Sequence, residues 1–220
     1  MRFGKNWILQ FWRQWGASFL IAVLIATSFK SAIADWNDIP TGSMEPTILI
    51  GDRIYVNKLA FDLKIPYTTR HLAQWNDPER GEIVVFFSPA DNKRLVKRVI
   101  GLPGDTVAMR DNRLILNHKA VCYSGMERTS PGRCVTFIEN LDGRNHRVRF
   151  DPSKPARRNF GPVVIPAGHY FLMGDYRDNS FDSRYFGPVH RDRIVGAASL
   201  VVFSRDLRGT RWNRIFRPLK

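Results

Sequence analysis

The chain of 220 residues has 44% hydrophobic content, which is ordinary for one globular domain with a core and room for a small insertion. Its formal net charge of +14 is the electrostatic signature of a phosphate-binding surface. No helix-turn-helix, zinc-finger or aromatic RNA-binding motif accompanies that charge, so nucleic acid is not an expected partner. An anionic bilayer attracts basic groups in the same way, by about 1 kcal/mol for each group near the surface. Residues 205–217 mix cations with aromatic and apolar side chains, which suits either a membrane interface or a solvated tail.

The N-terminal residues predict a membrane segment. Residues 1–14 carry three basic residues and no acidic one, and residues 15–29 are uncharged and largely apolar. A full span needs about 20 apolar residues, so the predicted anchor is 15–34. The positive-inside bias places the basic flank in the cytoplasm and residues 35–220 outside. Ala32-Ile33-Ala34 also resembles a signal-peptide cleavage site, and of these two fates we predict that the anchor is retained.

The rest of the chain predicts strands, because helical periodicity is absent after the N-terminal segment. The predicted strands are 53–57, 82–87, 95–100, 113–117, 135–139, 146–150, 168–173 and 197–203. The Asp111-Asn112 pair predicts a hairpin turn before 113–117. We therefore expect a mainly β fold whose core is formed by about 38–107 and 160–205, with a small β insertion at about 108–160.

Two cysteines, Cys122 and Cys134, lie in the predicted insertion. Two cysteines cannot supply the four ligands of a structural zinc site, and no metal or cofactor is expected. In an exported domain such a pair predicts a disulfide, worth about 3 kcal/mol on the chain-entropy model. Two free thiols are the alternative.

The first candidate for chemistry is Ser43, in the segment Pro40-Thr41-Gly42-Ser43-Met44-Glu45-Pro46-Thr47. Gly42 allows another backbone to approach closely, and Pro46 fixes φ and removes a donor, so the chain around the serine is bent and presented to a cleft. This suits a nucleophile, although the same residues also occur in ordinary turns. A serine hydroxyl needs a base, and a histidine is the familiar one. None of the five histidines lies in a triad-like block, and we interpret them as surface or packing residues; they are His71, His118, His146, His169 and His190.

The candidate base is Lys97, in the segment 94–105. On a strand, Leu95, Lys97 and Val99 share one face, so the amine emerges between two apolar side chains, while Arg98 points to the other face. Burial lowers the pKa of a lysine from about 10.4 toward the 7 to 8 that general-base chemistry requires. Without further support, a solvated strand lysine is the alternative.

The third block is Met173-Gly174-Asp175-Tyr176-Arg177-Asp178-Asn179-Ser180-Phe181-Asp182-Ser183-Arg184. Together with the segments around Ser43 and Lys97, it resembles the bacterial type I signal peptidases, over residues 38–107 and 160–205. The third block of that family usually reads Gly-Asp-Asn-Arg-Asp-Asn-Ser-x-Asp-Ser-Arg, and this sequence departs from it at Tyr176. By its composition alone, the block is also typical of a charged surface loop.

The resemblance implies residue roles. Ser43 is the expected nucleophile and Lys97 the general base of a Ser/Lys dyad. The oxyanion hole is expected from the Ser43 backbone N–H and the hydroxyl of Thr41, where many relatives have serine. Ser180 is expected to hydrogen-bond the lysine ammonium. Asp182 and Arg184 are expected to form a supporting ion pair.

The resemblance also implies a function: a membrane-bound serine endopeptidase that removes signal peptides from secreted precursor proteins, cleaving after small residues at −1 and −3. It places the enzyme in the bacterial inner membrane, with the catalytic domain on the periplasmic side, and makes the phospholipid bilayer a partner. The candidates for bilayer contact are Ile48, Leu49, Ile50 and Trp212. The alternatives are a specialised conjugative-transfer or pilin-processing peptidase with the same dyad, a cytosolic self-cleaving repressor, which the N-terminal segment disfavours, and a non-enzymatic basic membrane-attached binding protein.

Overall fold

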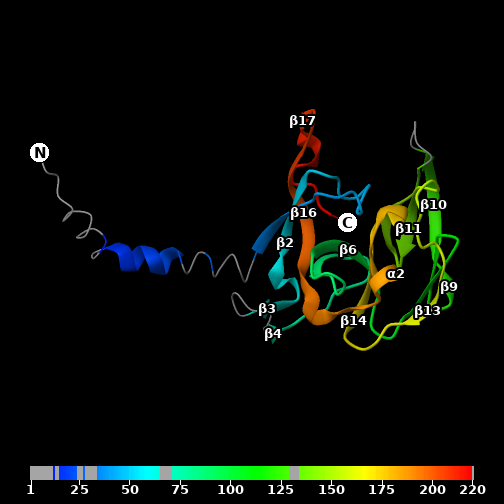
Figure 1. Cartoon of the computed structure of the whole chain (residues 1–220), viewed down its shortest axis with the longest axis horizontal. Coiled ribbons are helices and arrows are strands. Elements are labelled where there is room, and N and C mark those ends of the chain that lie inside the picture. Colours follow the sequence, from blue (N-terminus) through cyan, green and yellow to red (C-terminus); the bar gives the residue numbers. More distant parts are fainter. Residues whose placement is uncertain are drawn as a thin grey trace, which may run out of the picture.

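The computed structural model of the chain describes residues 12, 15–23, 27, 34–64, 71–128 and 134–219. These residues form a mainly β fold, which confirms the mainly β part of the predicted fold class (Figure 1). The largest sheet has eight strands in the order β1-β2-β16-β5-β6-β14-β15, with β17 paired to β16 beside that path. Its strands are β1 (Ala34–Asp38), β2 (Asp52–Asn57), β5 (Ile83–Phe87), β6 (Arg94–Gly101), β14 (His169–Met173), β15 (Val189–His190), β16 (Ile194–Asp206) and β17 (Gly209–Thr210).

The large sheet is curled, so that its first strand returns toward β6. In the strand order, β2, β16 and β5 separate β1 from β6. Nevertheless, Arg94 Nη1 at the start of β6 lies 2.9 Å from Asp35 Oδ2 in β1. A flat sheet with a strand spacing of about 4.8 Å could not bring these side chains together. The curl therefore places the residues before Ser43 opposite the strand that carries Lys97.

Two smaller sheets lie on the other side of the molecule in Figure 1. One has the order β13-β7-β8-β9 and contains β7 (Thr106–Arg110), β8 (Arg113–Leu116), β9 (Lys119–Ala120) and β13 (Phe160–Val164); the other has the order β10-β11-β12 and contains β10 (Cys122–Arg128), β11 (Val135–Leu141) and β12 (Arg144–Phe150). A two-stranded ribbon joins β3 (Asp62–Lys64) to β4 (His71–Gln74). The short helices are η1 (Lys58–Ala60), η2 (Arg177–Asn179), α2 (Ser183–Phe186), η3 (Arg191–Arg193) and η4 (Trp212–Arg214).

Tight two-residue turns build the smaller sheets. Asp111 and Asn112 have φ of 48° and 62° between β7 and β8, which confirms the predicted hairpin. Asp142 and Gly143, with φ of 50° and 89°, join β11 to β12 in the same way. Positive φ at both central positions matches the right-handed twist of the paired strands, which is why Asp and Asn are used there.

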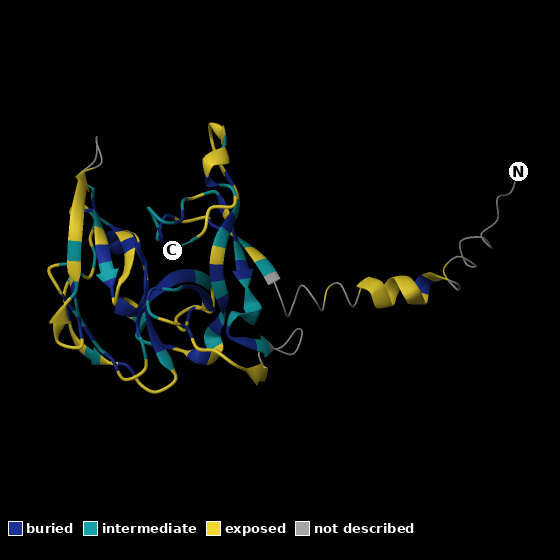
Figure 2. Ribbon diagram, turned by 180° about the vertical axis from the view of Figure 1, so that it is seen from behind, coloured by how far each residue is buried: buried dark blue, intermediate teal, exposed yellow. Residues whose placement is uncertain are grey.

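Buried apolar clusters hold the layers together, and two of them bear on the site. One packs Met44 and Ile48, on either side of the turn after Ser43, against Val85 and Val96 of the large sheet. A second packs strands of the inserted region against Ile100 of β6. The inserted region therefore shares its core with the large sheet, and Figure 2 shows its exposed side along β10.

The structure does not decide whether the N-terminal segment spans a membrane. No helix within the described ranges combines the length and the hydrophobicity that a membrane span requires. Part of the predicted anchor, 15–34, lies outside the described residues, so its span stays a prediction, and the same holds for residues 1–14, of which only Trp12 is described.

The predicted disulfide is wrong, because Cys122 and Cys134 are both free. In the β10–β11 ladder, Cys122 pairs with Asn140, whereas Cys134 immediately precedes Val135 at the opposite end. At about 3.3 Å per residue the two cysteines are roughly 20 Å apart, and a disulfide needs Cα atoms within about 7 Å.

Candidate active site

Ser43 lies in a turn that both flanking segments anchor in the core. Glu45 N–H donates to Gly42 O at 3.1 Å, and Ile48 N–H donates to Met44 O at 2.9 Å, so the backbone closes on itself around the serine. Met44 and Ile48 are almost fully buried. We call residues 42–48, which carry the candidate nucleophile Ser43, the nucleophile turn. Ile39 before Ser43 lies in the same buried cluster as Met44 and Ile48 after it, so the core holds the half-buried serine from both sides along the chain.

A buried carboxylate supports the end of this turn. Asp52 accepts from Leu49 N–H at 2.8 Å and from Arg214 Nη2 at 2.5 Å. Arg214 Nη2 also donates to Thr47 O at 3.0 Å, and Arg211 Nη2 donates to Ile50 O at 2.6 Å. Arg211 and Arg214 of the C-terminal segment thus support the nucleophile turn and the residues after it. Hydrogen bonds from a charged guanidinium are stronger than those between neutral groups.

Lys97 lies in β6, and its Nζ is 2.6 Å from Ser43 Oγ. The residue is 3% exposed. Burial lowers its pKa from 10.5 to about 8, while Asp182 and Asp175 oppose the shift and Arg184 assists it. The predicted burial of Lys97 is confirmed, and its neighbour on the same strand face, Val99, is fully buried.

Arg98 and Asp175 form a buried ion pair that sequence reasoning did not single out. Arg98 Nε and Nη2 donate to the two carboxylate oxygens of Asp175 at 2.8 and 2.7 Å. Thr47 Oγ1 donates to the same carboxylate at 2.5 Å. Burial alone would raise the pKa of Asp175, but the Arg98 guanidinium holds it below its usual value. This ion pair connects β6, the third block and the nucleophile turn. The alternation of residues along β6 indicates that Arg98 shares a face with Val96 and Ile100, but it does not indicate which carboxylate Arg98 contacts.

The third block packs against the nucleophile turn through its backbone. Tyr176 N–H donates to Ser43 O at 3.1 Å. A Cβ at Gly174 would lie 2.5 Å from Ser43 O and 2.4 Å from Ser180 Oγ. Only glycine permits an approach this close, so Gly174 is a geometric requirement of the site.

The predicted ion pair between Asp182 and Arg184 is present and fully buried, with Arg184 Nε 2.9 Å from Asp182 Oδ1. Asp182 Oδ2 also accepts from Gly174 N–H at 3.0 Å, so the pair fixes the start of the third block. Burial favours the neutral acid, but Arg184 keeps the pKa of Asp182 below its usual value.

The predicted hydrogen bond from Ser180 to Lys97 is not formed. Among the described residues the buried Ser180 hydroxyl has no well-aligned hydrogen-bond partner. The hydroxyl lies near enough to Asp182 to contribute to the lowered pKa of that carboxyl. Lys97 Nζ is directed to Ser43 instead.

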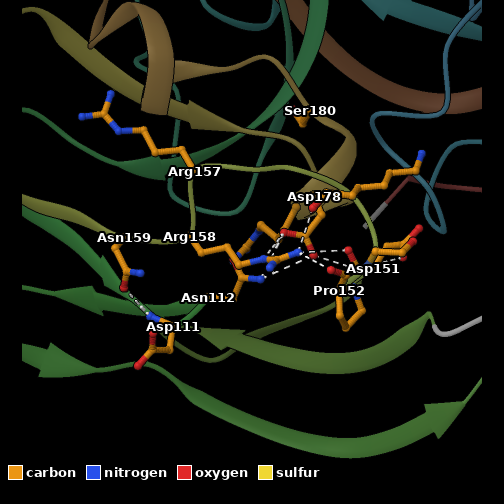
Figure 3. Close-up of polar contacts among 12 residues, drawn as sticks. Asp111, Asn112, Asp151, Pro152, Arg157, Arg158, Asn159, Asp178 and Ser180 are labelled. Carbon is orange, nitrogen blue, oxygen red and sulfur yellow. Dashed lines mark hydrogen bonds and ion pairs between the residues drawn. The ribbon is translucent and has the colours of Figure 1, made fainter.

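Asp178 ties the third block to the inserted region (Figure 3). Its carboxylate accepts from Asn112 Nδ2 at 3.1 Å, from Arg158 Nε at 3.2 Å and from Asp151 N–H at 2.7 Å. These partners come from the β7–β8 turn and from the segment after β12. No sequence pattern indicates this network, because its partners are distant along the chain.

Thr41 and the histidines complete the predicted set. Thr41 is exposed just before the nucleophile turn. His146 is buried, with Nε2 3.2 Å from Glu139, while the rings of His169 and His190 pack edge to face with centroids 4.9 Å apart. His118 is exposed, and the side chain of His71 lies outside the description. Within the described part of the chain no histidine hydrogen-bonds Ser43 or Lys97.

A serine hydroxyl in contact with a buried amine provides the nucleophile and the base that a serine hydrolase requires.

Residues 12–203 match the family described as signal peptidase, peptidase S26. The chain is 37% identical to signal peptidase I from Pseudomonas fluorescens and 38% identical to signal peptidase I from Pseudomonas aeruginosa, each over 205 residues that cover 87% of this chain and 72% of the relative. Among solved structures, it is similar to a signal peptidase I from Enterococcus faecalis, with 28% identity, a TM-score of 0.37 and coverage of 56% of this chain and 98% of that chain. The chain therefore belongs to the peptidase S26 family of signal peptidases.

Proposed function

We propose that this protein is a membrane-bound endopeptidase that removes signal peptides from secreted precursor proteins, with Ser43 as nucleophile and Lys97 as general base. The observation that carries the proposal is the 2.6 Å contact between Ser43 Oγ and the buried Lys97 Nζ. With a pKa of about 8, roughly a tenth of Lys97 is neutral at pH 7, which is enough to act as a base without another catalyst.

The proposed reaction uses the lysine twice. Neutral Lys97 takes the proton of Ser43 as Oγ attacks the scissile carbonyl, and the resulting ammonium gives a proton to the departing amine. The signal peptide then remains as an ester on Ser43. Lys97, neutral again, takes a proton from water as the water attacks that ester, and Ser43 recovers its proton when the acid leaves. The Ser43 N–H and the Thr41 hydroxyl are the proposed donors to the oxyanion.

The precursor is proposed to bind as an added strand. β1 pairs only with β2 among the described strands, so its other edge is free. β6 pairs with β14 only from Arg98 onward, which leaves 94–97 without a partner on that side. The curl of the sheet brings these two edges opposite each other, and main-chain hydrogen bonds from both could hold an extended peptide. Ile39 directly follows β1 and Val96 lies in the unpaired part of β6, and we propose that the small side chains at −1 and −3 pack against these two apolar residues.

Membrane contact is proposed for the end of the molecule that carries β17. Leu207 is fully exposed, Trp212 is 78% exposed and Phe216 is 73% exposed. Ile50, beside them through its hydrogen bond with Arg211, is also exposed, and Figure 2 shows the β17 tip as exposed. Ile48 is buried, so its assignment to bilayer contact was wrong, and Leu49 is half-buried. Apolar and cationic groups on one surface are the combination that anionic lipid favours.

Cleavage of a labelled precursor by the purified full-length chain tests the dyad. Ser43→Ala and Lys97→Ala should each abolish cleavage, and Lys97→Arg should also fail because guanidinium stays charged at working pH. Ser124→Ala and Lys119→Ala are matched controls, because both residues are exposed and far along the chain from the site. Near-normal cleavage by Ser43→Ala would contradict the proposal and favour a non-enzymatic binding protein, and cleavage of a single pilin-type substrate alone would favour the specialised peptidase.

A further inference from the structure

Arg149 of β12 connects the inserted sheet to the active site. Its backbone N–H donates to Asp175 O at 2.8 Å. Its guanidinium Nη1 donates to Glu45 Oε2 at 2.7 Å, and both side chains of this ion pair are 21% exposed. Glu45 lies two residues after Ser43, inside the nucleophile turn. A single residue of the inserted sheet therefore contacts both the third block and the turn.

Tyr176 reinforces this connection. It is 6% exposed, and its hydroxyl donates to Asp151 Oδ2 at 3.0 Å. The Arg149 guanidinium carbon lies 5.5 Å from the centre of the Tyr176 ring, and Lys154 Nζ lies 4.9 Å from it. A cation within about 6 Å of a ring centroid is attracted to the ring face, so the tyrosine orients Arg149 toward Glu45. This is the position at which the chain departs from the usual third block.

The end of the nucleophile turn is anchored by the contacts of Thr47 with Asp175 and Arg214, and two further contacts hold the residues next to Ser43. Tyr176 N–H holds the Ser43 carbonyl, and Arg149 holds the Glu45 carboxylate. The Thr47 contacts lie four residues after Ser43, whereas Tyr176 and Arg149 hold the positions within two residues of it, so these two contacts set the local orientation of the serine. The 2.6 Å separation of Ser43 Oγ and Lys97 Nζ depends on that orientation, and a displacement of about 1 Å in a reacting group can cost about 100-fold in rate.

We propose that Arg149 is a positioning residue which, with Glu45 and Tyr176, fixes the nucleophile turn relative to Lys97. The inserted sheet then contributes to the geometry of the active site through Arg149. This inference rests on the proposed role of Ser43 as nucleophile.

The test compares steady-state cleavage by full-length Arg149→Gln, Glu45→Gln and the double variant. Each single variant should lower kcat by about 10- to 100-fold and leave KM within about twofold, because neither side chain lies at the strand edges proposed for the precursor. The double variant should be no slower than the worse single variant, since both remove one interaction. Arg149→Lys, which keeps the charge, should recover part of kcat. Arg149 is not among the charges that shift the pKa of Lys97, so the acid limb of the pH profile should stay in place.

The matched control is Arg147→Gln on the same strand. Arg147 pairs with Glu127 at 3.1 Å, but these side chains are 56% and 66% exposed, and the variant should keep the parent kcat. Thermal unfolding of every variant separates positioning from misfolding, and Glu45→Gln keeps the test valid if Arg149→Gln fails to fold.

A kcat within twofold of the parent in folded Arg149→Gln, or losses that multiply in the double variant, would overturn the inference. Parallel measurement of Ser43→Ala separates the two proposals: cleavage by that variant defeats the dyad itself, whereas an inactive Ser43→Ala with a fully active Arg149→Gln defeats only the positioning role.

Discussion

The buried amine of Lys97 should lower the stability of the folded protein at neutral pH. Lys97→Met keeps most of the side-chain volume and removes the charge. The folded-state pKa of Lys97, about 8, lies below its ordinary value of 10.5 because burial disfavours the charged form. The unfolded chain therefore binds the proton more tightly, and the free energy of unfolding rises with pH between about 8 and 10.5.

The size of the effect follows from those two pKa values. One pKa unit corresponds to about 1.4 kcal/mol, so the separation between 10.5 and about 8 costs about 3 kcal/mol at pH values below 8. The variant also loses the contact with Ser43, which is worth about 1 kcal/mol. Lys97→Met should therefore be more stable than the parent by about 2 kcal/mol at pH 7, which is a rise in Tm of roughly 4 to 8 °C for a chain of this size. Above pH 10.5 the advantage should disappear.

Urea denaturation of the parent and of Lys97→Met at pH 7 and pH 10.5, under otherwise identical conditions, measures this difference. Lys93→Met is the control, because its ammonium is exposed and it should show no such pH-dependent gain. A difference between parent and Lys97→Met that does not change with pH, or a variant less stable at pH 7, would refute the assignment of a buried, destabilising ammonium.

Three further predictions concern activity. The acid limb of kcat/KM should have its midpoint near pH 8, because Lys97 must be neutral to accept a proton, and a midpoint near 6 measured over pH 5 to 10 would point to a histidine instead. Gly174→Ala should lower cleavage by about 100-fold, since the new Cβ would lie 2.5 Å from Ser43 O, whereas Gly161→Ala, with open space around its Cβ, should keep parental activity; equal rates for the two would contradict the close approach. A precursor with Leu in place of Ala at −1 should resist cleavage, because a bulky side chain displaces the scissile carbonyl, and comparable rates for Ala and Leu would argue against a small pocket.

The sequence predicted those features that depend on neighbouring residues. Alternation along 95–99 correctly indicated that Lys97 is buried beside Val99, and the Asp111-Asn112 pair indicated its hairpin. Alternation could not indicate β10, because nearly every residue of that strand is exposed and it has no apolar face to read.

Contacts between residues that are far apart along the chain could not be predicted from the sequence. The partner of Arg98 is 77 residues away, so the face of a strand can be inferred but not the carboxylate that meets it. The predicted export of the domain suggested that Cys122 and Cys134 are paired, yet the ladder holds them at opposite ends. Ser180 and Tyr176 were matched to a motif, but only the fold shows that one lacks the expected contact and that the other holds the Ser43 carbonyl.

The brace between Asp52 and Arg214 has a consequence for the order in which the site is completed. Chains are synthesised from the N-terminus at about 5 to 20 residues per second, so the 171 residues from Ser43 to Arg214 take roughly 10 to 30 s. During that interval Asp52 lacks its guanidinium and the nucleophile turn lacks the donor to Thr47 O. A nascent chain that extends past Lys97 thus carries the proposed dyad but not the contacts that Arg214 makes, and we expect its competence to cut a polypeptide to arise only after the C-terminal segment has been made.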